Sequence, residues 1–213
     1  MNITLERSLR QLNKAHVTDG ELKFLLRGRS MDGQKAIIKR AVSEEVVVRL
    51  RRGLYWVSDF VTTTKPHERE LGCLMYGDAC VSLESALSFH GMIPEAVYTT
   101  TCATPLRNRD FRTKLGAFSF CHVPAKNFLV GTKRLELYGT AFFMATPWRA
   151  LTDYVYCYKK FWASLSELEE DIRLNVDEFP KLSKKLMSQL IAYYDCKRVT
   201  LFLTSMMREQ NHG

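Results

Sequence analysis

The segment VVVRLRRGLYWVS at residues 46–58 most constrains the fold, because two β-prone runs are joined there through three arginines and a glycine. Such a pattern predicts a β-hairpin, with Gly53 supplying the positive φ angle of a tight turn. Strand alternation predicts an inward and an outward set: Val46, Val48 and Leu50 toward the core, and Val47, Arg49 and Arg51 away from it. In isolation, the arginines could simply be the solvated tip of a hairpin.

Three helices are predicted before this hairpin. The first is indicated by the near-helical spacing of its apolar residues, which are Ile3, Leu5, Leu9 and Leu12. The second begins at a capping box formed by Thr18 and Glu21, and Gly28 is placed to end it. The third spans residues 32–42, with Ser30 or Asp32 as its N-cap.

The third predicted helix has two chemically different faces. At 100° per residue, one face is apolar and the opposite one is largely basic: Ile37, Ile38, Ala41 and Val42 against Lys35, Ala36, Lys39 and Arg40. Two helices joined by a tight turn and followed by a hairpin are the layout of a winged helix, whose second helix enters the DNA major groove. We therefore expect double-stranded DNA binding through the basic helix face and the wing: Lys35, Lys39, Arg40, Arg49, Arg51 and Arg52. A winged helix used only for protein contacts is the alternative.

Charge supports an anionic partner. The net charge is +8, and residues 27–52 hold eight Lys and Arg residues against three Asp and Glu residues, a local excess of +5. A second basic stretch, PLRNRDFRTKLG, contains Arg107, Arg109, Arg112 and Lys114. This stretch could form another nucleic-acid surface or a solvated loop.

A composition break at Lys65 and Pro66 predicts two domains, residues 1–64 and 65–213. Pro66 could open a helix. Beyond it, we expect a helix that Ser82 caps and Gly91 ends, then strands in VYTTTCA, AFSFCHV and AFFMAT. Thr146 and Pro147 predict another helix start, and helical patterns return after Ser164. The expected fold class is therefore α/β (α+β), with an N-terminal winged helix, a larger mixed domain and a helical end.

The remaining composition excludes several classes. No stretch approaches the ~20 apolar residues of a membrane span, and charges interrupt the first residues where a signal peptide would be apolar, so we expect a cytoplasmic protein. The six cysteines contain no C-x-x-C pair, which favours reduced, mostly buried thiols. Without a metal-ligand cluster or a phosphate-binding glycine loop, we expect no metal, no cofactor and no enzyme activity.

Three motifs in order, RRGLYWVS, VSLESALSFHGMIPEAVYTTT and ATPWRALTDYVY, resemble the AbiEi antitoxins of type IV toxin-antitoxin systems over roughly residues 5–160. The resemblance implies a repressor that binds inverted repeats in the promoter of its own operon. It also implies that residues 65–213 counteract a nucleotidyltransferase toxin without forming a lasting complex with it. At the position directly before Arg149, the family commonly has glutamate, whereas this chain has Trp148.

Two residue pairs within these motifs could be structural or functional. Arg149 and Asp153 have i,i+4 spacing, and we expect a supporting ion pair. Ser85 and His90 lack an identifiable orienting carboxylate, so helix packing and C-terminal capping explain them more simply than catalysis. The alternative function is a nuclease or nucleotidyltransferase relative whose acidic residues are dispersed along the chain.

The expected oligomeric state follows from how little surface one winged helix covers on DNA, about 600 to 1,000 Å². So small an interface seldom gives the affinity of a repressor for its operator, and two copies therefore usually bind repeated half-sites. The sequence has no sustained heptad repeat that would drive a coiled-coil dimer. We therefore expect a monomer in solution that pairs on inverted repeats.

Overall fold

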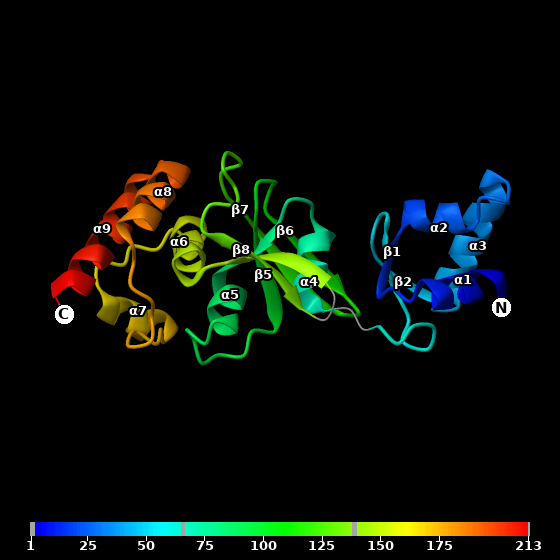
Figure 1. The fold of residues 1–213 in the computed structure, drawn as a ribbon, viewed down its shortest axis with the longest axis horizontal. Helices are drawn as coiled ribbons and strands as arrows, with labels where there is room; N and C mark the ends of the chain where they lie inside the picture. The colour runs from blue at the N-terminus through cyan, green and yellow to red at the C-terminus, as the bar shows by residue number, and fades with distance from the viewer. Residues whose placement is uncertain (1–2, 65–66, 138–139, 213) are drawn as a thin grey trace. The chain divides into compact units, whose positions relative to one another are not determined.

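A computed structural model describes residues 3–64, 67–137 and 140–212 (Figure 1). The chain has a mixed α+β fold, as predicted, and divides into two compact units, Met1–His67 (unit 1) and Glu68–Gly213 (unit 2). The boundary predicted after residue 64 and the predicted helix start at Pro66 fall at residues 65–66, which lie outside the described residues.

Unit 1 has three helices and a three-stranded sheet among its described residues. In chain order they are α1 (Ile3–Leu12), β1 (His16–Thr18), α2 (Asp19–Leu25), α3 (Met31–Ser43), β2 (Val47–Arg51) and β3 (Leu54–Val57). The antiparallel strands have the order β1-β3-β2, which together with the helix order is the topology of a winged helix. The short strand β1 was not predicted from the sequence.

Local capping explains where the helices α2 and α3 begin. The predicted capping box is present, since Thr18 accepts from the Glu21 backbone N–H at 3.2 Å and Glu21 accepts from the Thr18 N–H at 2.8 Å. Ser30 caps α3 by accepting from Gly33 N–H. Helix α2 ends at Leu25, so the prediction that Gly28 ends it was wrong.

The turn between α2 and α3 is held by a buried side chain. The Gln34 amide donates hydrogen bonds to the backbone carbonyls of Leu26 and Arg29, at 3.2 and 3.1 Å. These bonds tie the first turn of α3 to the backbone that follows α2. The position of α3 against α2 is therefore determined by Gln34 as well as by the apolar core.

The hairpin differs from its predicted alternation. Val47 is fully buried opposite Val57, whereas it was expected to point away from the core, and Val48 is only half-buried. The reason is a register shift between Arg49 and Arg51, which breaks the two-residue period. Gly53 has φ +82°, the left-handed conformation predicted for the turn.

Unit 2 contains a six-stranded mixed sheet with the order β6-β7-β5-β4-β9-β8. Its strands are β4 (Cys80–Val81), β5 (Thr99–Thr104), β6 (Arg109–Thr113), β7 (Gly116–His122), β8 (Thr132–Leu137) and β9 (Thr140–Ala145). Its helices are α4 (Glu68–Met75), α5 (Leu83–Phe89), α6 (Pro147–Tyr158), α7 (Leu165–Ile172), α8 (Lys184–Tyr194) and α9 (Lys197–His212). The predicted strands correspond to β5, β7 and β9, while β4, β6 and β8 were not predicted.

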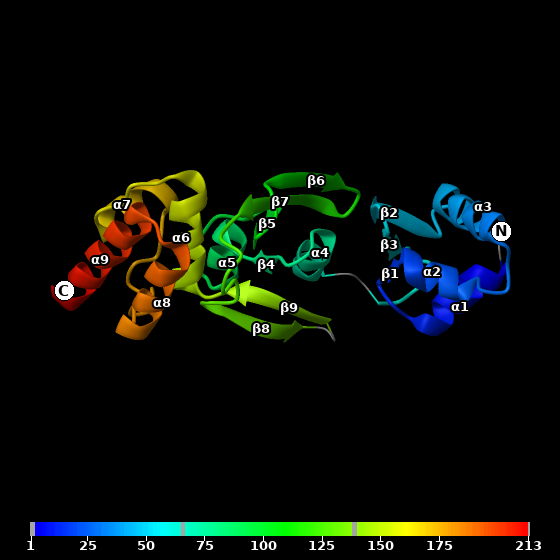
Figure 2. The same ribbon diagram turned by 90° about the horizontal axis from the view of Figure 1, so that it is seen from above.

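Side-chain alternation along β5 places helices on both faces of this sheet. A Cβ added to Gly72 of α4 would lie 3.0 Å from side-chain atoms of Thr100 and Cys102, so α4 packs closely on that face. Thr101 points to the other face, where its hydroxyl donates to the Ser82 carbonyl before α5. Helices α8 and α9 contact α6 and extend the unit beyond the sheet (Figure 2).

A buried ion pair joins α6 to the segments around it. Arg149 Nε donates to Asp153 Oδ2 at 2.9 Å, and both side chains are fully buried, so the predicted pair is present. Asp153 also accepts from Ser82 at 2.5 Å and from the Tyr194 hydroxyl. Arg149 donates further to Tyr193 and to two backbone carbonyls. The pair is therefore saturated by hydrogen bonds, as a buried pair must be to avoid a large desolvation cost.

Other predictions in unit 2 were partly confirmed. Helix α6 has Thr146 as N-cap and Pro147 at its start, but the Thr146 hydroxyl donates to the Gly131 carbonyl and does not cap the helix. Trp148 is buried and donates from Nε1 to the Pro180 carbonyl at 2.6 Å. All six cysteines are free thiols, with Cys80 and Cys102 buried and the other four partly exposed. Within the described ranges, every helix is too short or too polar to cross a membrane.

Candidate nucleic-acid interface

A groove of about 330 Å³ in unit 1 brings helix α3 and the hairpin together. Residues from α2, α3, β2 and β3 line it: Asp19, Lys23, Met31, Lys35, Ile38, Lys39, Val42, Arg49 and Tyr55. Four of these side chains are cationic and one is acidic. We call this set the α3–β2 groove.

Lys35 and Lys39 lie one helical turn apart on α3, so their side chains extend from the same face. The Lys35 ammonium is 3.2 Å from Asp32, but both side chains are largely exposed, at 70% and 95%. An exposed ion pair of this kind contributes little to stability, so Lys35 can exchange Asp32 for another anion. Lys39 is exposed and makes no ion pair within the described residues.

Arg49 reaches the groove through the register of the hairpin. It pairs with Tyr55 across the strands, on the sheet face that also contains buried Val47 and Val57. This face packs on the helices, so the exposed Arg49 lies beside α3. The sequence predicted that Arg49 points away from the core; its side chain is exposed, but it extends from the sheet face that packs on the helices.

The other three predicted contact residues lie outside the groove lining. Arg40 is about 100° around the helix from Lys39 and donates to Glu44 at 2.9 Å, a hydrogen bond that lowers the pKa of Glu44. Arg52 is exposed at the hairpin turn. Arg51 is partly buried, and its Nη1 donates to the Arg52 carbonyl at 2.9 Å. The six residues therefore form a groove trio of Lys35, Lys39 and Arg49, a hairpin pair of Arg51 and Arg52, and a separate Arg40.

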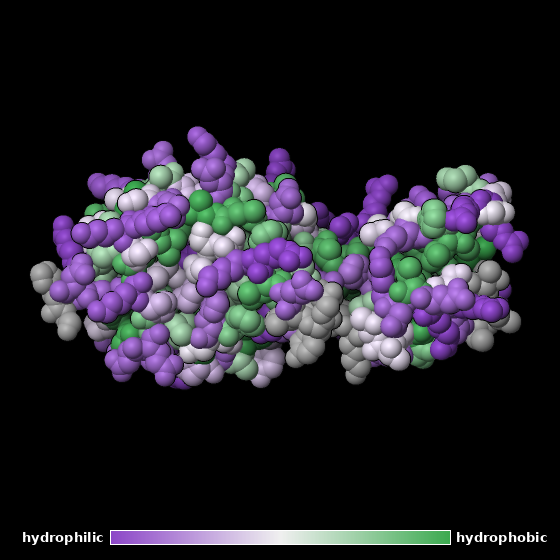
Figure 3. Space-filling model, in the orientation of Figure 1, coloured by the Kyte–Doolittle hydropathy of each residue, from purple (hydrophilic) through white to green (hydrophobic). Residues whose placement is uncertain are grey.

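Positive charge is concentrated in unit 1. Residues 1–67 contain 13 Lys and Arg residues and 7 Asp and Glu residues, a net +6 of the total +8. Hydrophilic side chains border hydrophobic surface on the unit that contains α3 (Figure 3). Two large hydrophobic side chains of unit 1, Met31 and Phe24, are 60% and 64% exposed, and the Arg27 guanidinium lies 4.6 Å from the Phe24 ring centroid. Sequence reasoning missed Met31, although its place at the start of α3 is where recognition helices contact base edges.

The second basic stretch forms edge strand β6, and alternation divides its cations. Arg109 lies over the rings of Tyr76 and Phe111, at 5.8 and 4.9 Å from their centroids, on the α4 face of the sheet. Arg112 shares the opposite face with Asp110, which accepts a hydrogen bond from Ser119 at 2.8 Å. Arg107 precedes the strand and Lys114 follows it. These four residues therefore do not present a single surface.

The residues considered for catalysis have structural partners. Ser85 accepts from Thr101 N–H at 2.8 Å and donates to the Thr99 carbonyl, and so joins α5 to β5. His90 follows α5 as its C-cap, and its Nε2 lies 2.9 Å from the Ala145 carbonyl. Among the described residues, no three His, Cys, Asp or Glu side chains are grouped to hold a metal ion.

Comparison of the sequence with protein-family models and with curated proteins found no match.

Proposed function

We propose that this protein is a DNA-binding transcriptional repressor that acts through unit 1. The observation on which this rests is the α3–β2 groove, where Lys35 and Lys39 of the second helix in a helix-turn-helix lie beside Arg49 of the wing. A helix that enters the major groove presents such residues to base edges and phosphates, while a wing arginine contacts the backbone. The net charge of unit 1 favours the same partner.

The three cations have different expected roles. An arginine can bind guanine or phosphate through two hydrogen bonds, whereas lysine acts as a flexible point charge. We assign Lys35 and Lys39 to the major groove because they extend from α3, and Arg49 to the flanking phosphate because it extends from the strand beside α3. Arg52 at the turn is placed for a further phosphate or minor-groove contact.

Binding is tested with the full chain by fluorescence anisotropy, using duplex DNA from its own promoter region and an unrelated duplex of equal length. The variant Lys35→Ala/Lys39→Ala/Arg49→Ala should bind the promoter duplex at least about 100-fold more weakly, because each charged contact contributes roughly 1.5 kcal/mol or more. A matched control removes three exposed lysines, Lys181 before α8 and two in its first turn: Lys181→Ala/Lys184→Ala/Lys185→Ala. Equal losses in the two triple variants would contradict the proposal, because net charge alone would then explain binding.

We further propose that unit 2 provides the antitoxic activity implied by the resemblance to AbiEi antitoxins. Unit 2 has its own sheet and its own buried core, so it has the structure required for a separate role. The test expresses the neighbouring toxin gene from an unrelated promoter together with the triple groove variant. Growth rescue equal to that of the wild type supports separate roles, and loss of rescue contradicts them.

A further inference from the structure

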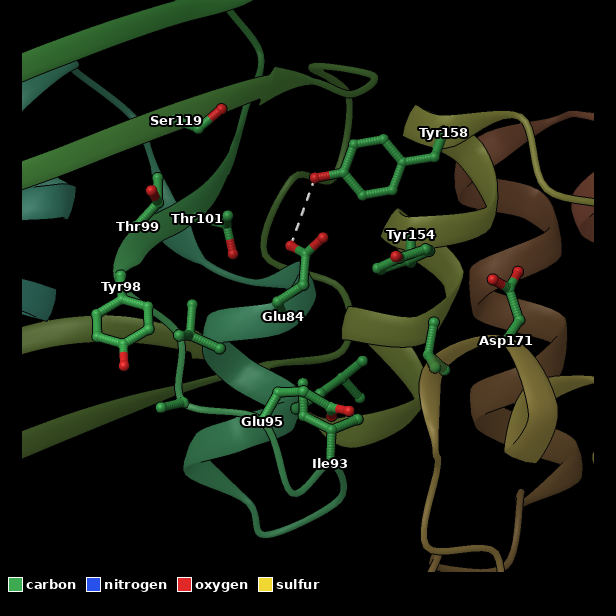
Figure 4. Close-up of a pocket in the computed structure, with 14 residues that line it drawn as sticks. Glu84, Ile93, Glu95, Tyr98, Thr99, Thr101, Ser119, Tyr154, Tyr158 and Asp171 are labelled. Atoms are coloured by element: carbon green, nitrogen blue, oxygen red, sulfur yellow. Dashed lines mark hydrogen bonds between the residues drawn. The ribbon is translucent and has the colours of Figure 1, made fainter.

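Unit 2 contains an open cavity of about 620 Å³ lined by residues of α5, α6, α7, β5, β7 and the segment before β5 (Figure 4). Three of its lining residues are charged, and all three are acidic: Glu84, Glu95 and Asp171. No Lys or Arg is among the lining residues, although the chain as a whole has a net charge of +8. The cavity is therefore a locally anionic site in a basic protein.

Two of these carboxylates already have cationic partners. Asp171 accepts from Lys160 Nζ at 2.6 Å and from Trp162 Nε1 at 2.9 Å. Glu95 lies 3.6 Å from Arg173 Nε. Glu84 is half-buried, and its contact is a 3.4 Å hydrogen bond from the Tyr158 hydroxyl, with no ion pair among the described residues. Among the described residues, Glu84 is thus the carboxylate of this cavity that has no cationic partner.

Aromatic rings flank this carboxylate. Tyr154 and Tyr158 are one turn apart on α6, their ring centroids lie 4.5 Å apart, and the rings are nearly perpendicular at 78°. Figure 4 shows the Tyr158 hydroxyl directed toward Glu84, with Tyr154 on the same side of the cavity. Burial, together with the charges of Glu84 and Asp171, raises the pKa of Tyr154 to about 12, so the phenol stays neutral. Neutral rings beside an unbalanced carboxylate are the elements of a site for an organic cation.

We propose that this cavity binds a guanidinium group, with Glu84 as its counter-ion and the ring of Tyr158 as its stacking surface. A guanidinium suits the site better than an ammonium because it is planar, stacks on aromatic faces and donates two parallel hydrogen bonds to one carboxylate. The cavity is open, so the group can belong to an arginine of a partner protein or to a free alkylguanidine. The inference does not depend on the DNA-binding proposal, which concerns unit 1.

The test is isothermal titration calorimetry of the full chain. Two guanidinium probes are used, free agmatine and the capped tripeptide acetyl-Gly-Arg-Gly-amide, and n-butylamine serves as the ammonium counterpart. We expect saturable binding of the guanidinium probes and weaker binding of n-butylamine. Tighter binding of the tripeptide assigns the site to a protein side chain, and tighter binding of agmatine assigns it to a free guanidine. Absence of saturable binding by both guanidinium probes overturns the proposal.

Single substitutions test whether the probes bind at Glu84 and Tyr158. Glu84→Gln should weaken the preferred probe about tenfold or more, because it removes a charge-assisted hydrogen bond. Glu95→Gln is the matched control, since the same substitution in the same cavity affects a carboxylate already paired with Arg173. Tyr158→Leu should also weaken binding, because it removes the aromatic ring beside Glu84. Equal affinity of the wild type, Glu84→Gln and Tyr158→Leu would contradict the assignment.

Discussion

Arg49 on β2 pairs with Tyr55 on β3, on the sheet face that packs against the helices of unit 1. Because Tyr55 is buried, the Arg49 backbone is held at the border between core and solvent. Its guanidinium therefore shares the α3–β2 groove with Lys35 and Lys39. The relationship places Arg49 of the hairpin beside helix α3 and separates it from Arg52, which lies outside the groove lining.

Arg49→Ala should weaken binding to promoter duplex about ten- to hundredfold, since a hydrogen bond between charged groups contributes roughly 1.5 to 3 kcal/mol. Arg40→Ala should cost less than about threefold, because Arg40 lies outside the groove and pairs with Glu44. Anisotropy titrations of both single variants at one salt concentration make the comparison. A larger loss for Arg40→Ala would show that another face of α3 contacts the DNA.

Asp153→Ala should lower the free energy of unfolding of unit 2 by about 3 to 5 kcal/mol, because the Arg149 charge would remain buried without its carboxylate. Arg149→Met/Asp153→Leu should recover part of this loss, since it removes both charges. Urea unfolding followed by tryptophan fluorescence in a Trp56→Phe background reports on Trp148 and Trp162 of unit 2. If Asp153→Ala unfolds at the wild-type urea concentration, the pair has no structural role.

Gly131→Ala should destabilise unit 2 by more than about 1 kcal/mol through backbone strain and a steric clash. Gly131 has φ +70°, and an added Cβ would lie 2.9 Å from the Arg149 Cβ. The matched control is Gly91→Ala, which also has a positive φ of 72° but has open space where the Cβ would be. The difference between their thermal midpoints isolates the clash with Arg149, and equal midpoints would mean that this close approach is unimportant.

Unit 2 should lose stability at alkaline pH. Burial raises the pKa of the Cys73 thiol from 9.0 to about 11 and that of the Tyr154 phenol from 10.0 to about 12. Between the unfolded and folded pKa values the folded chain keeps a proton that the unfolded chain has lost, so the free energy of unfolding falls as pH rises. This contribution is complete below about pH 9 and is lost progressively up to about pH 12.

The measurement is the urea midpoint at pH 8 and pH 11. We expect a lower midpoint at pH 11, and a smaller decrease for Tyr154→Phe because that variant has one fewer titrating group. An identical decrease in the wild type and the variant would exclude Tyr154 from the effect.

The winged-helix topology was predictable because its signals are local. The Thr18 capping box, the Ser30 cap and the Gly53 turn each depend on residues a few positions apart. The three-residue strand β1 was not predictable, since it is too short to show a period and exists through its pairing with β3. Strand β6 was missed because its sequence is charged, as edge strands often are.

The candidate site was only partly predictable. Lys35 and Lys39 follow from helical spacing, but Arg49 was assigned to the wrong side because the register shift after it cannot be read from alternation. Met31 also lines the groove and was missed, although its place at the start of α3 was a signal. The cavity around Glu84 combines residues from α5, α6 and β5 that are far apart in sequence, so only the fold brings them together.

The salt dependence of duplex binding tests most directly whether the α3–β2 groove contacts DNA. For the wild type, the logarithm of the association constant should fall linearly with the logarithm of salt concentration, with a slope of about −0.9 for each phosphate neutralised. Replacing Lys35, Lys39 and Arg49 together should make that slope less steep by about 2 to 3 units, because each of these residues would release one counterion. A wild-type slope near zero, or an unchanged slope in the triple variant, would contradict the account.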